Sequence, residues 1–114
     1  MNTRYYSNRQ EKKVAKRLGG KKTANSGATA FQKGDILTDA FLIECKTKVK
    51  DGKSFTIKED WLSKNAEEAF AMNKPYSALC FDFGPASRKR YYVISEKLFY
   101  TLQCILEGDA YENK

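Results

Sequence analysis

The sequence predicts a mixed α/β fold, an α+β mixed sheet that carries helices, and three observations support this prediction. Two short apolar segments of strand length, 35–37 and 41–46, are separated by the turn-forming pair Thr38-Asp39. A longer apolar run at 76–83 is typical of a strand that is covered on both faces. Apolar residues at helical spacing occur before, between and after these strands, which predicts helices packed on the sheet.

The first predicted helix follows Ser7-x-x-Gln10, which resembles a capping box, and ends at Gly19-Gly20. Its thin apolar stripe includes Glu11, so this carboxylate is expected on the buried face. A buried charge needs a partner because desolvation of an unpaired carboxylate is costly. A lysine or the helix N-terminus would satisfy Glu11, or Glu11 is an additional acid of a metal site; both interpretations stay open here.

Residues 19–34 are rich in glycine, lysine, serine, threonine and alanine and predict a flexible basic loop, suited to closing over a phosphate backbone. An ordinary loop without such a role is the alternative. After the strand pair, Asp51-Gly52 is a tight-turn signal, and residues 54–57 predict a third strand.

Thr56-x-x-Glu59 resembles a second capping box, and the helix that it opens is expected to end before Pro75. Trp61 lies on the apolar side of this helix and is expected to be a core anchor rather than a base-stacking residue. The apolar strand at 76–83 follows and is expected to be central in the sheet.

Residues 91–94 predict the last strand, and Ser95 is expected to cap a final helix with Gly108 beyond its end. This helix is strongly apolar for its length, so it is either the main core helix or a dimer surface. The predicted order is αβββαββα, in one domain at 1–114 with a core at about 8–107 and loose ends at 1–6 and 109–114.

The positive charge of the chain is concentrated in its first third. The formal net charge is +7, and residues 1–34 carry nine lysines and arginines against one acid, Glu11. Residues 35–114 carry twelve against thirteen acids. Such a concentration predicts a polyanionic partner, of which nucleic acid is the commonest, with a solubilising surface as the alternative.

The sequence also excludes several classes. It has no histidine, which excludes histidine-based zinc sites, Ser-His-Asp triads and imidazole catalysis. No segment reaches the ~18 apolar residues of a membrane span, so no membrane partner is expected. Cys45, Cys80 and Cys104 each lie in an apolar run and are expected to be buried, reduced thiols, which fits a cytoplasmic location.

The strand pair is the candidate active site. Residues two apart in a strand share a face, so Glu44 and Lys46 are expected side by side, about 6–7 Å apart along the strand. Pairing of the two strands would bring Asp35 beside them. Two carboxylates and the main-chain carbonyl of Cys45 are the oxygen ligands that Mg²⁺ prefers, and Glu11 is expected to complete this set directly or through water.

This arrangement predicts metal-dependent cleavage of a phosphodiester. One or two Mg²⁺ ions lower the pKa of a bound water and neutralise developing charge. Lys46 is expected to orient or help deprotonate the attacking water and to stabilise the pentavalent phosphorus. Two alternatives belong to other classes: a non-catalytic basic nucleic-acid-binding module, and a structural protein that assembles through its last helix.

At these residues the chain resembles the PD-(D/E)XK nuclease superfamily, and within it archaeal and phage-type Holliday-junction resolvases. The resemblance covers about residues 8–100 and rests on segments that match in order: Glu11, Ser26-Gly27, Gly34-Asp35, Ile43-Glu44-Cys45-Lys46 and 90–98. No proline precedes Asp35. Lys21 and Lys22 stand where an arginine is expected, and lysine cannot form the two-pronged contact with phosphate that arginine forms.

The resemblance implies a restriction-endonuclease-like αβββαβ core with a C-terminal helix. It implies a homodimer that cleaves four-way or branched DNA with Mg²⁺, or Mn²⁺ in its place, in a prokaryotic or phage-infected cell. Asp35 and Glu44 would be metal ligands, Lys46 the catalytic lysine, Glu11 the helix acid and Ser26 a loop serine that assists cleavage. A related nuclease with a nicking, repair or packaging role shares the same core and stays open.

Binding to DNA is expected to weaken steeply with salt, because several phosphates would be neutralised by lysine and arginine. No element resembles a major-groove recognition helix, so strong sequence-specific readout is not expected. The residues expected to contact DNA are Arg4, Arg9, Lys12, Lys13, Lys16, Arg17, Lys21, Lys22, Lys33 and Lys48.

Overall fold

The computed structural model describes the backbone at residues 3–22 and 35–108 and the side chains at 9–21 and 35–108. It has the predicted order of helices and strands, although one strand comes from a different segment. The elements are α1 (Thr3–Leu18), β1 (Lys21–Lys22), β2 (Ile36–Leu37), β3 (Phe41–Lys46), α2 (Glu59–Ala71), β4 (Tyr76–Phe81), β5 (Tyr91–Val93) and α3 (Glu96–Glu107).

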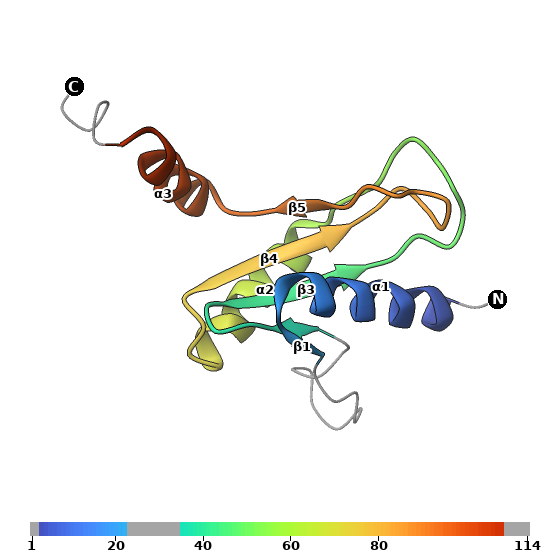
Figure 1. Ribbon diagram of the computed structural model, residues 1–114, viewed down its shortest axis with the longest axis horizontal. Coiled ribbons are helices and arrows are strands. Elements are labelled where there is room, and N and C mark those ends of the chain that lie inside the picture. Colours follow the sequence, from blue (N-terminus) through green and yellow to red (C-terminus); the bar gives the residue numbers. More distant parts are fainter. Residues whose placement is uncertain (1–2, 23–34, 109–114) are drawn as a thin grey trace.

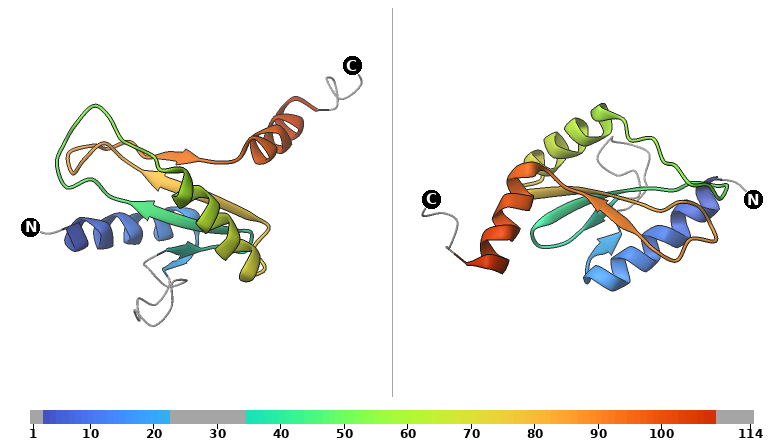
Figure 2. Two further views of the ribbon diagram at one scale, coloured as in Figure 1. Left: turned by 180° about the vertical axis from the view of Figure 1, so that it is seen from behind. Right: turned by 90° about the horizontal axis from the view of Figure 1, so that it is seen from above.

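The strands form one mixed sheet in the order β1-β2-β3-β4-β5 (Figure 1). β3 and β4 are parallel, and the other neighbours are antiparallel. Parallel strands need a crossover connection, and α2 is part of it. The helices α1 and α2 cover opposite faces of the sheet (Figure 2). β4 has a neighbour on each side, which confirms that the apolar strand is central.

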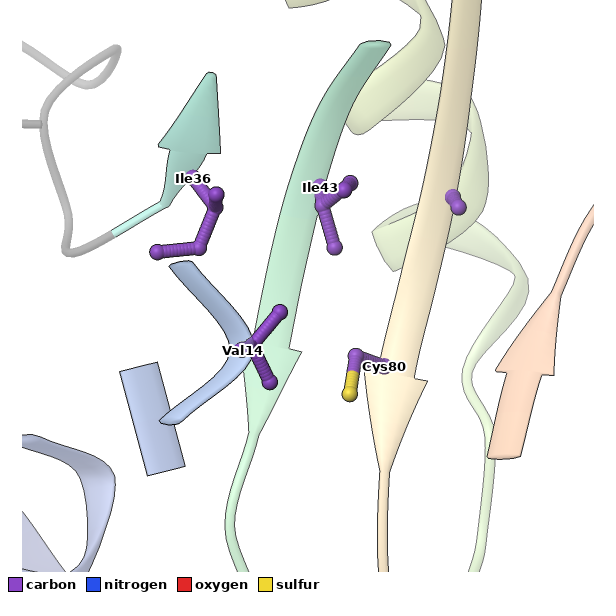
Figure 3. Close-up of a cluster of buried hydrophobic side chains, with 5 residues drawn as sticks. Val14, Ile36, Ile43 and Cys80 are labelled. Atoms are coloured by element: carbon purple, nitrogen blue, oxygen red, sulfur yellow. The ribbon is translucent and has the colours of Figure 1, made fainter. Parts of the chain in front are cut away.

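The core on the α1 face is made by small and branched apolar side chains from four elements (Figure 3): Val14, Ile36, Ile43, Ala78 and Cys80. Ile36 and Ile43 are cross-strand partners, and Phe41 and Cys45 pack against the same cluster. The prediction that Phe41, Ile43 and Cys45 share one face of their strand is therefore confirmed. Full burial of each branched side chain contributes about 1.5–3 kcal/mol.

On the other face, a buried asparagine connects α2 to the sheet. Asn65 is 2% exposed, and its Nδ2 donates to the carbonyl oxygens of Ala78 at 3.0 Å and Leu42 at 3.5 Å. One side chain thereby fixes α2 against both β3 and β4.

The start of the first helix differs from the prediction. α1 begins at Thr3, so Ser7 lies inside the helix, and residues 3–6 are not a loose end. Gln10 is not part of a capping box. It is buried, and its Oε1 accepts a 2.7 Å hydrogen bond from the Thr47 hydroxyl, which ties α1 to the end of β3. The end of the helix at Leu18, before Gly19, was predicted correctly.

The prediction of a strand at 54–57 is wrong. Both edges of β3 are already paired, with β2 and β4, so the sheet offers no partner at that place. The chain instead packs through Phe55, whose ring stacks on Phe81 with centroids 4.6 Å apart. The third strand of the first group is β1, in the segment predicted to be a loop.

β1 forms because the chain turns back closely after α1. Lys21 pairs with Leu37 and Lys22 with Ile36. A Cβ at Gly20 would lie 2.7 Å from the Leu37 carbonyl oxygen, so only glycine allows this approach without displacement.

The capping prediction is wrong for the first of the two later helices and confirmed for the second. α2 begins at Glu59 with Lys58 at its N-cap and no side-chain cap bond, so the capping box at Thr56 is wrong. The acidic pair Glu59 and Asp60 in the first turn interacts favourably with the helix dipole instead. The Ser95 cap of α3 is confirmed, since its Oγ accepts a 3.1 Å hydrogen bond from the Leu98 N–H.

α3 is not the main core helix. Leu98 is its one buried residue, and the helix lies beyond β5, away from the body of the sheet (Figures 1 and 2). No helix within the described ranges is long and apolar enough to cross a membrane. Within the described residues the cysteines form no disulfide; Cys80 is fully buried, whereas Cys45 and Cys104 are partly exposed.

We expect Asn65→Ala to lower the free energy of unfolding by about 1–3 kcal/mol, because it removes a buried donor that serves two strands. Urea denaturation followed by circular dichroism measures this loss. Ser63→Ala, at an exposed position of the same helix, is the matched control and should change the value by less than about 0.5 kcal/mol. Equal effects of the two substitutions would contradict the role given to Asn65.

Candidate active site

The antiparallel pair β2–β3 places Asp35 beside Glu44. Ile36 pairs with Ile43 and Leu37 with Leu42, so one step further in the same register Asp35 stands opposite Glu44. Neighbouring residues of a strand alternate between faces, so both acids lie on the face opposite the Ile36–Ile43 core, toward α2. The meeting of Asp35 and Glu44 that the sequence predicted is therefore present.

Lys46 lies two residues after Glu44 on the same face, as predicted. Its Nζ is 3.2 Å from Oε2 of Glu44, and the side chains are 32% and 18% exposed. The same Nζ lies 4.3 Å from the centroid of the Trp61 ring. A cation at this distance over an aromatic face is stabilised by about 0.5–2 kcal/mol. The lysine is thus held between a carboxylate and a ring.

Trp61 was expected to be a core anchor, and it has a second contact. Its ring packs on Phe55 with centroids 6.4 Å apart, which fixes the indole against the loop that precedes α2. Lys58 also approaches the ring, at 5.7 Å. The indole therefore contacts the Lys46 ammonium through its face and also packs α2 against the preceding loop.

Burial and negative neighbours determine the charge state of Asp35, which is only 3% exposed. Desolvation, followed by the negative charges of Glu44, Glu68 and Glu11 in that order, raises the pKa of this carboxyl to about 7, and the nearby Lys46 lowers it in part. Asp35 is therefore close to half protonated at neutral pH, and a cation bound there would favour its ionised form.

Glu68 is an acid of this cluster that the sequence reasoning missed. It is on α2 and acts on the pKa of Asp35 more strongly than Glu11 does. Trp61, Asn65 and Glu68 are spaced by four and three residues, so they share one face of the helix. Had Asn65 been recognised as a buried position, this spacing would have placed Glu68 toward the sheet.

Glu11 is buried on α1, as its place on the apolar stripe predicted, with 3% exposure. It raises the pKa of Asp35, so the structure brings it within electrostatic range of the strand pair. The helix begins at Thr3, eight residues earlier. Since the helix dipole acts mainly within the first turn, the helix N-terminus is not the partner of this carboxylate.

The donor atoms suit a hard divalent cation. Asp35 and Glu44 offer carboxylate oxygens, and the buried Oε2 of Glu44 accepts no hydrogen bond within the described residues, although the Lys46 ammonium is near. Over the same residues, no three histidine, cysteine, aspartate or glutamate side chains form a group that could hold an ion as they stand. Mg²⁺ needs only one or two carboxylates because it keeps several waters. The pair therefore fits Mg²⁺.

Several predicted site residues are not tested by the structure. Ser26 and Lys33 lie outside the described residues, as do the side chains of Arg4 and Lys22. The main-chain carbonyl of Cys45 as a metal ligand stays a prediction; its thiol points to the other face, toward the core.

The basic residues of α1 are separated from its buried residues. Gln10, Glu11 and Val14 are buried, whereas the lysines and arginines whose side chains the structure describes are exposed. Lys21 in β1 is exposed as well, and Lys48 donates to the carbonyl oxygen of Ser54 at 2.7 Å. The exposed basic residues of α1 are Arg9, Lys12, Lys13, Lys16 and Arg17.

The chain was compared with known families, proteins and structures. No family model matches it, and no curated protein or solved structure is significantly similar to it. The geometry of the site therefore carries the functional argument.

We expect the metal-free protein to lose stability between about pH 4 and pH 7. The pKa of Asp35 is raised to about 7 in the folded state, so over this range the folded chain holds a proton that the unfolded chain has released. Stability then falls as the pH rises, by up to about 4 kcal/mol. Chemical denaturation in EDTA at pH 5 and pH 8 measures the part of the loss between these values, about 2.5 kcal/mol.

Asp35→Asn is the control for this pH dependence, because the amide does not titrate. Its unfolding free energy should change less between pH 5 and pH 8 than that of the unsubstituted protein. A difference of the same size in both proteins would show that another group is responsible.

Proposed function

We propose that this protein is a divalent-metal-dependent DNA endonuclease that hydrolyses phosphodiester bonds. One observation carries the proposal: Asp35, Glu44 and Lys46 lie on one face at the β2–β3 pair, with the lysine held 3.2 Å from Glu44 and 4.3 Å from the Trp61 ring centroid. One buried and one partly buried acid with one ordered lysine suit the hydrolysis of a phosphate ester better than they suit packing, because the acids destabilise one another.

Asp35 and Glu44 would hold Mg²⁺, or Mn²⁺ in its place, and the ion when bound would supply charge neutralisation and a more acidic water. Lys46 is a three-donor cation beside the acids, and it would donate hydrogen bonds to the phosphoryl oxygens as negative charge develops on them. Trp61 restricts the lysine to the site. Glu11 and Glu68 add negative charge that strengthens the attraction for a cation.

The order of elements supports the proposed relationship to PD-(D/E)XK nucleases. The sequence α1-β1-β2-β3-α2-β4 corresponds to an αβββαβ core followed by β5 and α3. Asp35 precedes the second strand, and Glu44 and Lys46 are in the third, where that superfamily would carry them. On this basis the proposed substrate is four-way or otherwise branched DNA, and related nicking, repair or packaging nucleases are the neighbouring possibilities.

A non-catalytic nucleic-acid-binding module is the second candidate. The exposed basic side of α1 favours it, because this surface would bind a polyanion whatever the buried acids do. The two candidates differ in whether a metal ion stimulates cleavage.

We expect Asp35→Asn and Glu44→Gln each to abolish Mg²⁺-stimulated cleavage while binding to DNA is retained, because each removes an anionic ligand. Lys46→Ala should lower the rate by roughly 10²–10³-fold, the usual loss when a donor to a developing oxyanion is removed. The assay uses labelled four-way junction, linear duplex and single strand with Mg²⁺ or EDTA.

Asp60→Asn removes an exposed acid of α2 that pairs with Lys64, and it is the matched control, expected to cleave normally. Full cleavage by both Asp35→Asn and Glu44→Gln would exclude the nuclease proposal. Binding without any cleavage by the unsubstituted protein, with every substrate and with Mn²⁺ as well, would favour the non-catalytic module.

We also propose a homodimer that forms through α3. This helix exposes large apolar side chains, with Ile105 72% and Leu106 84% exposed, and its N-cap and last turn are regular. An apolar cavity of about 440 Å³ lies between the sheet, α1 and α3, and it is lined by Leu18, Phe41 and Tyr92 among others.

A second copy of this chain is the occupant that the charges favour. α3 carries two acids, Glu96 and Glu107, and one lysine, Lys97, so it is nearly neutral on a chain of net charge +7. Two copies can therefore meet at this helix without bringing their basic regions together.

Ile105→Glu/Leu106→Glu is expected to convert a dimer into a monomer, because two charges would be buried at the contact. Sedimentation equilibrium measures the change in mass. Glu107→Gln, on the same turn, should leave the dimer intact. A monomeric unsubstituted protein would rule out this assembly, and an unchanged dimer in the double variant would move the interface elsewhere.

A further inference from the structure

A basic groove lies on the α1 face of the sheet, opposite the face that carries Asp35 and Glu44. Two adjoining cavities of about 40 and 370 Å³ form it, and Arg90 lines both. One wall is α1, and the other is the turn between β4 and β5. Both cavities together are called the α1 groove below. Its basic residues are Arg9, Lys13 and Arg17 on the helix, Lys48 after β3, and Arg88, Lys89 and Arg90 on the turn.

The helix wall presents a regular row of cations. Arg9, Lys13 and Arg17 are each four residues apart, so they lie along one side of α1 at intervals of about 6 Å. All three side chains are exposed. Lys12 and Lys16 follow the other side of the same exposed surface, nearer to Glu11. The row suits a linear polyanion rather than a single small anion.

The turn wall is held in place by hydrogen bonds that do not involve its basic side chains. The Gly84 N–H donates to Asp82 Oδ1 at 3.0 Å, and the Ala86 N–H donates to Asp51 Oδ1 at 2.8 Å. Gly84 has φ +136°, and a Cβ there would lie 2.4 Å from the Asp51 Cα, so the turn requires glycine. Ser87 Oγ donates to the Lys89 carbonyl oxygen at 3.1 Å.

Basic residues far outnumber acids in the lining of the groove. Asp82 is the one acid among the residues that line it, and its oxygens accept from the Gly84 N–H and, at 3.4 Å, from Gln10 Nε2. The Nε of Arg90 is buried and has no hydrogen-bond partner within the described residues. An unmade hydrogen bond at a buried charged donor is unfavourable, so an anionic acceptor at this Nε–H would be stabilising.

The groove begins where the candidate active site ends. Thr47 and Lys48, which line its smaller cavity, directly follow Lys46 at the end of β3. Exposed Tyr92, which pairs with Cys80 of the α1-side core, lines its larger cavity, where an aromatic ring can stack on a sugar or base. A nucleic-acid strand at Lys46 can therefore pass over the carboxyl end of the sheet into the groove.

We infer that the α1 groove binds the sugar–phosphate backbone of DNA, with the turn 88–90 as a second contact opposite α1. The sequence indicated the helix cations but not this turn, which becomes a wall of the groove only because β5 lies beside β4. The inference rests on the proposed nuclease function and adds a binding surface for the part of the DNA that lies beyond the cleaved phosphate. Arg90 contacts phosphate from a partly buried position, and the helix row contacts it from the surface.

Binding is tested in EDTA, so that cleavage plays no part, by fluorescence anisotropy with labelled duplex and four-way junction. The variant Arg9→Gln/Arg17→Gln/Arg90→Gln is expected to bind at least tenfold more weakly. The slope of log K against log[salt] should become shallower by about 2–3, since each lost phosphate contact contributes about 0.9. The matched control Lys53→Gln/Lys64→Gln/Lys97→Gln removes equal charge elsewhere and should change affinity less than threefold.

Arg9→Gln/Arg17→Gln is a second variant that leaves the partly buried Arg90 in place, in case the triple variant does not fold. Its slope should become shallower by about two thirds as much as that of the triple variant. Equal losses in the groove and control variants would overturn the inference, as would competition by an acidic peptide or anionic vesicles as effective as that by DNA. Loss of cleavage in Asp35→Asn without loss of binding tests the nuclease separately, so either proposal can fail alone.

Discussion

The pairing of Ile36 with Ile43 is the constraint on which the site depends. These two side chains are buried on the α1 face, and every second residue of the same strands faces α2. A shift of one of these strands by one residue would turn its isoleucine away from the core and place Asp35 and Glu44 on opposite faces of the sheet. The hydrophobic core therefore determines where the acids meet, and it does so from the side of the sheet that the acids do not touch.

The acid cluster opposes folding, and the surrounding elements hold it together. Glu11 comes from α1, Asp35 from the start of β2, Glu44 from β3 and Glu68 from α2, so no local segment contains the cluster. Their mutual repulsion and the burial of Asp35 are offset by packing elsewhere, for example by the Asn65 hydrogen bonds to β3 and β4. Buried acids that repel one another and have shifted pKa values are common at sites that bind a ligand or ion.

The parts of the fold that depend on local pattern could be predicted, and those that depend on sheet order could not. The two-residue period placed Glu44 and Lys46 on one face, and the Ser95 cap followed from its position before an apolar helix. The segment 54–57 has strand-like residues, yet β3 is paired on both sides and leaves no edge for it. Glu68 and the 88–90 turn were missed because their neighbours come from distant parts of the chain.

Trp61 gives the molecule a built-in spectroscopic probe. It is the single tryptophan of the chain, and its ring faces the Lys46 ammonium at 4.3 Å while Glu44 lies on the other side of that ammonium. Indole emission responds to nearby charge, so any event that pulls Lys46 off the ring changes the fluorescence of the whole protein. The side chain that confines the lysine thus also reports, without a label, on whether the site is occupied.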